Sequence, residues 1–149
     1  MPMRQRSLLI IFYSAVILLS GACSKGGNAV DDHSGGGGGN PSPNDVTPPI
    51  LDIYTPTANQ VFTSGNNIDI SGRIADDLGL YRGSIRITND ATGQVVKEQL
   101  YEIHYVLLYS FNISYTTSVT VPTDYTVTVF FEDHGYNSAT KSVKVKVNP

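Results

Sequence analysis

Cysteine is almost absent from this chain: Cys23 is the only one among 149 residues. No intramolecular disulfide can form, so a small fold held together by disulfides is excluded. Tryptophan is absent altogether, and the 10 lysines and arginines are outnumbered by 13 acids. Without a basic patch, we expect binding neither to nucleic acid nor, through charge, to anionic lipid head groups.

Long apolar runs are missing as well. The segment Leu8 to Leu19 reads LLIIFYSAVILL and is 12 residues long, whereas a membrane-spanning helix needs about 20 residues. Residues 1–7 carry two arginines and no acid, and this arrangement is typical of a signal peptide with its apolar h-region. The small residues of Ser20-Gly21-Ala22 then precede Cys23. We therefore predict that residues 1–22 are an export signal, cleaved before Cys23.

Cys23 would then be the first residue of the mature chain, and its thiol is the group that the bacterial lipoprotein pathway acylates. An unpaired thiol on an exported protein otherwise has no purpose. We predict a palmitate-type lipid anchor at Cys23 in the outer membrane, held by several acyl chains because one chain binds only marginally. Ser20 replaces the usual leucine three residues before the cysteine, and an ordinary secretory cut at the same bond is the alternative.

The mature chain is more acidic than the precursor, because the signal peptide takes two arginines with it and the formal net charge moves from −3 to −5. Its next segment, residues 23–46, contains seven of the 14 glycines, five of them consecutive. Such a segment lacks the apolar side chains that would offset its ordering entropy, so we predict a flexible tether spanning about 25 Å. It would hold a small domain off the lipid surface.

From Thr47 onward, apolar and polar residues alternate with the period of half-buried strands. Turn-forming clusters separate the runs, and no stretch shows a helical apolar stripe. We predict about seven antiparallel strands, near 50–55, 67–75, 80–88, 94–103, 105–116, 125–132 and 139–147. Seven short strands over residues 47–149 predict one all-β, immunoglobulin-like sandwich without disulfides.

Two stretches of the chain resemble bacterial Ig-like domains. The first half of such a domain is matched by Thr55-Pro56-Thr57, Val61-Phe62, Gly65, Ile68 to Gly72 and Asp76 to Leu80. The last hairpin is matched by Asp124 to Val129 and Glu132 to Asn137, with Tyr136 inserted before the usual Asn. The whole chain resembles the single-domain Ig-like lipoproteins of Bacteroidetes-type bacteria. This resemblance implies the fold but no particular activity, because the fold hosts many functions.

The resemblance leaves the side of the membrane open. Surface-displayed lipoproteins of these bacteria often carry acids directly after the cysteine, whereas here Asp31 and Asp32 follow at a distance. Both a periplasmic and a surface-exposed location fit the sequence.

Ig topology places the segment before the first strand, the loop between the second and third strands and the final hairpin loop at one end of the sandwich. These segments contain Asp45, Asp76, Asp77, Glu132, Asp133, His134 and Asn137. Calcium binds six to eight oxygen ligands, and Asp76, Asp77 and Asp133 are the predicted ligands. The alternative, which we favour, is that these acids accept backbone hydrogen bonds in their own turns. Apart from calcium, no cofactor is expected.

Tyr101, Tyr105 and Tyr109 share one face if residues 101–109 form a continuous strand. Exposed tyrosines would form a platform for a sugar ring or a protein partner. The alternative, which we favour, is that Tyr101 and Tyr105 help to fill the core together with Ile103 and Leu107, and a break near His104 would change which face each residue takes.

No nucleophile stands beside a histidine in any recognisable motif, so the sequence does not predict an enzyme. The leading hypothesis is a lipid-anchored envelope protein whose non-catalytic domain binds a protein or a glycan. The alternative is a structural spacer or accessory subunit of an outer-membrane complex, stabilised by calcium.

Overall fold

A computed structural model describes residues 44–149 of the chain. The predicted signal peptide, Cys23 and most of the predicted tether lie outside the described residues. Within the described part, no helix is long and apolar enough to cross a membrane. The strands are β1 (Ile50–Thr55), β2 (Gln60–Thr63), β3 (Asn67–Asn89), β4 (Val95–Thr116), β5 (Thr123–Asp133) and β6 (Ser138–Asn148).

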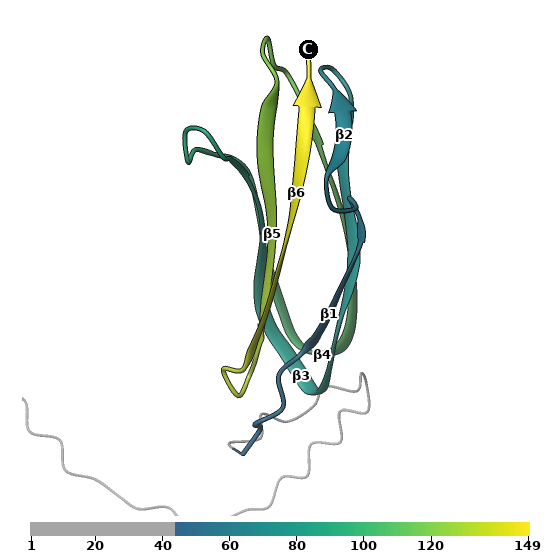
Figure 1. The fold of residues 1–149 in the computed structure, drawn as a ribbon. Helices are drawn as coiled ribbons and strands as arrows, with labels where there is room; N and C mark the ends of the chain where they lie inside the picture. The colour runs from purple at the N-terminus through teal and green to yellow at the C-terminus, as the bar shows by residue number, and fades with distance from the viewer. Residues whose placement is uncertain (1–43) are drawn as a thin grey trace, which may run out of the picture. The chain divides into compact units, whose positions relative to one another are not determined.

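The strands pair in the order β1-β3-β5-β6-β2, and β4 pairs with β3 outside this path. The first part of the long β3 pairs with β1 and with the second half of β4, whereas its second part pairs with β5 and with the first half of β4. The short β2 runs parallel to β6. The sheet therefore curls so that its two halves face each other as an all-β, Ig-like sandwich (Figure 1).

The core lies between these two halves. Ile70 and Ile74 of the first part of β3 are fully buried, as are Ile85 of its second part and Val127 of β5. The rings of Phe111 (β4) and Phe131 (β5) stack at 5.8 Å between centroids. The core of the described part thus consists of the alternate apolar residues that strand periodicity assigns to one face.

The strand count differs from the prediction. The predicted strands 67–75 and 80–88 are one strand, β3, and 94–103 and 105–116 are one strand, β4. The polar cluster at Asp76 to Gly79 bends β3 without ending it, because the ladder shifts register there and resumes at Leu80. The sequence did not reveal β2, since a four-residue strand has too short a pattern and pairs with distant β6.

Candidate functional site

Four segments meet at one end of the sandwich: the bend of β3, residues 104–107 of β4, the β5–β6 turn and the residues before β1 (Figure 1). The backbone N–H of His134 donates to the Gly79 carbonyl at 3.3 Å. The side chain of Asn137 donates to the Asp45 carbonyl at 3.1 Å. A side chain on Gly79 would lie 3.0 Å from Tyr105 Cα, so β3 and β4 touch here. The loop end predicted from Ig topology therefore forms.

Three aspartates converge at this loop end. One carboxylate oxygen from each of Asp45, Asp76 and Asp77 lies within 4.8 Å of the other two. Asp76 accepts hydrogen bonds at Oδ2 from the backbone N–H groups of Leu78 (3.0 Å) and Gly79 (2.6 Å). Its other oxygen, Oδ1, is buried and has no hydrogen-bond partner among the described residues. The carboxylate of Asp76 therefore caps its own turn and also belongs to the cluster that could hold a cation.

The electrostatics of the cluster act against the charged form of Asp76. Burial raises the pKa of Asp76, and the carboxylates of Asp133 and Asp45 raise it further, against the lowering effect of its backbone hydrogen bonds. A cation would relieve this unfavourable combination of burial and like charge.

The predicted ligand Asp133 has a different surrounding. It is fully buried, and its two oxygens accept hydrogen bonds from the backbone and side-chain nitrogens of Asn137 at 2.9 and 3.0 Å. It therefore holds the β5–β6 turn, and Asp45 takes the third place in the cluster. Sequence reasoning assigned Asp45 to this end but not to the ligand set. Glu132, also expected here, instead pairs with Arg82 at 2.6 Å.

Five aromatic rings pack together at the same end: Tyr81, His104, Tyr105, His134 and Tyr136. The rings of Tyr105 and His134 stack at 4.1 Å, and Tyr81 lies 4.7 Å from His134. Tyr105 and Tyr136 have φ angles of 61° and 65°, which are uncommon for residues with a side chain. Burial and the neighbouring His104 lower the pKa of His134. The cluster connects β3, β4 and the β5–β6 turn.

The structure does not bring the three predicted platform tyrosines together. Tyr101 and Tyr109 contact each other at 5.6 Å and are partly buried against the core, and burial raises the pKa of Tyr101 to about 12. Tyr105 turns away with its positive φ angle. Ile103 is buried as the core alternative expects, but Leu107 is exposed. The pairing of β4 with β3 shifts register near residues 102–106. The alternation of faces along β4 therefore does not continue from one side of this shift to the other.

A groove of about 510 Å³ lies on the outer face of β3, β4, β5 and β6. Its lining combines apolar, hydroxyl and charged side chains: Arg82, Gly83, Ser84, Arg86, Leu100, Thr128, Phe130, Glu132 and Thr140. The exposed Leu100 and the half-buried Phe130 are unusual on a solvent-facing sheet surface. Sequence reasoning missed this site, although Phe130 stands at a polar position of the alternating β5 pattern.

Two ion pairs border the groove. Arg82 binds Glu132 at 2.6 Å and also lies 5.1 Å from the centre of the Tyr81 ring. Arg86 binds Glu98 at 2.5 Å. Because each guanidinium is fixed by its carboxylate, the polar groups around the apolar surface are held in defined positions.

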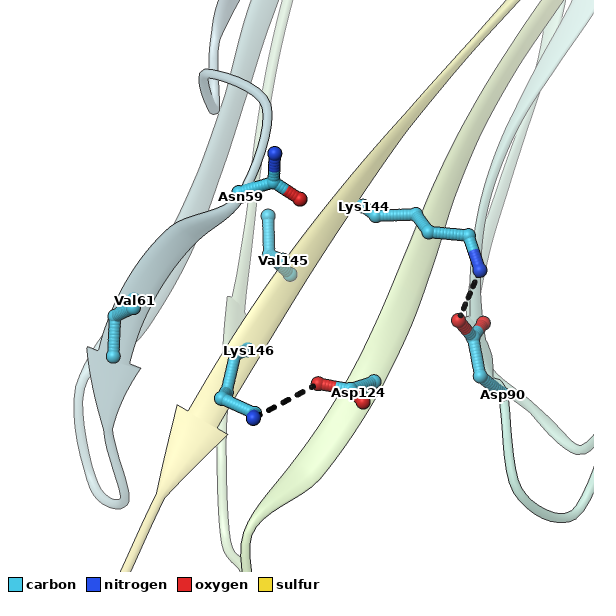
Figure 2. Close-up of a pocket in the computed structure, with 7 residues that line it drawn as sticks. All are labelled: Asn59, Val61, Asp90, Asp124, Lys144, Val145 and Lys146. Carbon is cyan, nitrogen blue, oxygen red and sulfur yellow. Dashed lines mark hydrogen bonds and ion pairs between the residues drawn. The ribbon is translucent and has the colours of Figure 1, made fainter.

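A second, smaller pocket of about 270 Å³ lies toward the C-terminal end of β6 (Figure 2). Lys144 pairs with Asp90 at 3.1 Å, and Lys146 pairs with Asp124 at 4.0 Å. A hydrogen bond from Thr126 and the charge of Lys144 lower the pKa of Asp90. This pocket is smaller than the groove, and no aromatic side chain is among the described residues that line it, which makes it a weaker candidate than the groove.

Neither protein-family models nor curated proteins match the chain. Among solved structures, it is similar to a chain from "Structures of Clostridium thermocellum CbhA fibronectin(III)-like modules", with 16% sequence identity and a TM-score of 0.40. The match covers 69% of this chain and 48% of that chain, so it spans about half of that chain's length. The Ig-like description therefore depends on this protein's own strand order and register.

Proposed function

We propose that this protein is a lipid-anchored member of the bacterial cell envelope whose Ig-like domain binds a ligand without catalysing a reaction. The signal-peptide pattern and the lone Cys23 support the anchor in the outer membrane. The motifs shared with single-domain Ig-like lipoproteins of Bacteroidetes-type bacteria support the same assignment. The groove on the outer face of β3, β4, β5 and β6 is the observation that supports binding.

The lining of this groove favours a glycan over a peptide. In the floor of the groove, β3 and β5 are each paired on both edges, so a peptide lying over these two strands cannot add to either of them as a further strand. A ligand bound there is recognised by side chains. The Phe130 ring offers an apolar surface against which a sugar ring can pack, and the hydroxyls of Ser84, Thr128 and Thr140 can bind sugar hydroxyls.

Binding of the mature full-length chain to a glycan array and to solubilised envelope proteins tests this proposal. Phe130→Ala should weaken glycan binding by about tenfold, because it removes the central apolar contact. Val121→Ala is the matched control, since Val121 is 63% exposed and does not line the groove. Binding to an envelope protein and to no glycan would move the ligand class to protein. Binding to neither would contradict the proposal.

A second proposal concerns the loop end. We propose that Asp45, Asp76 and Asp77 hold a calcium ion that stabilises the domain. Asp133, at the end of β5, adds negative charge near these carboxylates. The buried Asp76 Oδ1, which has no hydrogen-bond partner within residues 44–149, is the specific observation that favours this, because calcium prefers carboxylate oxygens. A rise in melting temperature on adding calcium is the expected result.

A further inference from the structure

The large apolar side chains exposed to solvent are not evenly spread over the described domain. Of the 12 that are exposed, five lie on the segments that form the loop end, and two more, Ile50 and Leu108, directly adjoin these segments. Tyr136 is one of these seven, and we name the other six the apolar tip: Val46, Ile50, Leu78, Val106, Leu107 and Leu108. Scattered exposed apolar residues are ordinary, but a contiguous group marks a surface that contacts something apolar.

The register of the strands shows how sharply the apolar tip ends. Ile50 pairs with Ala75, and Ala75 pairs with Leu108. These three residues thus form an apolar row across the outer face of β1, β3 and β4.

The next row on the same face is polar. It consists of Asp52, Arg73 and Ser110, with an ion pair of 3.1 Å between Arg73 and Asp52 and a second contact from Lys141 to Asp52 at 3.7 Å. The surface therefore changes from apolar to charged within one row, as a surface at a lipid boundary does.

The chain also enters the domain at this end. Figure 1 shows the chain entering β1 from this end, and Asp45, one of the first described residues, accepts a hydrogen bond from Asn137 in the loop end. The tether predicted from the sequence leads back to Cys23, and its predicted span of about 25 Å would keep this end of the domain near the lipid. A tether of that kind raises the local concentration to the millimolar range, and weak apolar contacts then suffice for docking.

We propose that the apolar tip docks on the surface of the membrane that carries the lipid anchor, with the groove facing sideways into solvent. This inference rests on the lipid anchor proposed above. The exposed Asp77 and the net charge of the mature chain oppose an anionic surface, so the fitting partner is a zwitterionic bilayer. Tyr136, 76% exposed beside the tip, fits the interface because tyrosine places an apolar ring and a polar hydroxyl there.

The lipidated full-length protein in phosphatidylcholine vesicles tests the docking. Because acylation consumes the Cys23 thiol, Leu107→Cys provides one site for an environment-sensitive fluorophore. We expect a blue-shifted emission that is quenched by lipids carrying a quencher on their acyl chains. The matched control is Val121→Cys, which lies between β4 and β5 at the opposite end and should report water. Identical, water-like emission from both labels would overturn the proposal.

A second measurement separates docking from anchoring. The mature full-length chain with Cys23→Ser should float weakly with the same vesicles, and adding Leu107→Glu with Leu108→Glu should reduce that partition by at least about tenfold. Val121→Glu should leave it unchanged. Mass spectrometry of the wild-type N-terminus tests the anchor independently. If the glutamate variant instead converts a dimer to a monomer in sedimentation and leaves flotation unchanged, the tip is a self-association surface and the proposal is wrong.

Discussion

Replacing Asp76 with Asn separates the two roles of this residue at the loop end. The substitution keeps an oxygen that can accept the backbone N–H groups of Leu78 and Gly79 but removes one negative charge. Carboxylate oxygens of Asp76 and Asp45 lie within 4.8 Å, where two unit charges repel by about 1 to 3 kcal/mol at effective dielectric constants of 80 to 20. Without calcium at pH 7, we expect Asp76→Asn to raise the free energy of unfolding by about 1 kcal/mol.

The pH dependence gives this prediction a sign. Burial, with the carboxylates of Asp133 and Asp45, raises the pKa of Asp76 above its usual 3.8. A group with a higher pKa in the folded state adds stability below the unfolded-state pKa and loses it as the pH rises through the folded-state pKa. The advantage of the variant should therefore be largest at neutral pH and shrink as the pH falls toward 3.8. Urea unfolding in EDTA at several pH values measures it.

Calcium should reverse the order of the two proteins. At 100 times its dissociation constant, a ligand stabilises the folded state by about 2.7 kcal/mol, which for a domain of roughly 100 residues is a rise in Tm of more than about 10 °C. Asp76→Asn should show a smaller rise because it lacks one charged ligand. Asp124→Asn, a control outside the cluster, should respond as the wild type does.

Two results would refute this reasoning. A loss of stability in Asp76→Asn at neutral pH without calcium would mean that Asp76 acts mainly as the acceptor for Leu78 and Gly79. No change in the wild-type Tm with calcium would remove the calcium proposal.

Three further predictions concern other parts of the chain. Gly83→Ala places a Cβ 2.2 Å from the Phe131 ring and should lower the free energy of unfolding by about 2 to 3 kcal/mol. The control is Gly93→Ala, whose new Cβ would have no described atom within 4 Å but whose backbone has a φ of +71°. This control should lower the free energy of unfolding by only about 1 kcal/mol. Equal losses in urea unfolding would contradict the packing argument. Because the pKa of His134 is lowered in the folded state, its contribution to the free energy of unfolding is fully present above pH ~6.5 and is lost as the pH falls through the folded-state pKa. His134→Gln should flatten that part of the profile of stability against pH. An unchanged profile would refute the assignment. Cys23→Ser should move the protein from the membrane to the soluble fraction, whereas an unacylated wild-type N-terminus in mass spectrometry would disprove the anchor.

Periodicity predicted much of the fold because a strand places alternate residues on opposite faces wherever it lies. The alternation from Tyr125 to Phe131 correctly assigned the core face of β5. The same reasoning failed at residues 76–79. Turn-forming residues bend β3 there, but β3 pairs with β4 both before and after the bend. It also failed at Tyr105, whose positive φ angle interrupts the alternation on which the platform of three tyrosines depended.

The candidate sites were less predictable than the fold. Sequence and Ig topology assigned the acids to one end, but which of them meet depends on how the side chains pack. Asn137 donates hydrogen bonds to both carboxylate oxygens of Asp133. Asp45 is therefore the third member of the cluster with Asp76 and Asp77. The groove around Phe130 gave no motif because its lining residues come from four strands and are separated by many positions in the chain.

Properties that depend on neighbouring residues can be read from the amino-acid order: the predicted export signal, the lone cysteine, the glycine-rich segment and the face that each regular strand turns inward. Which distant residues share a surface follows from the fold alone. Ile50 and Leu108 form one apolar row because β3 lies between their strands in a particular register, and a shift of that register by one residue would turn them to the other face. Register is set by the packing of the whole core, so no local pattern contains it.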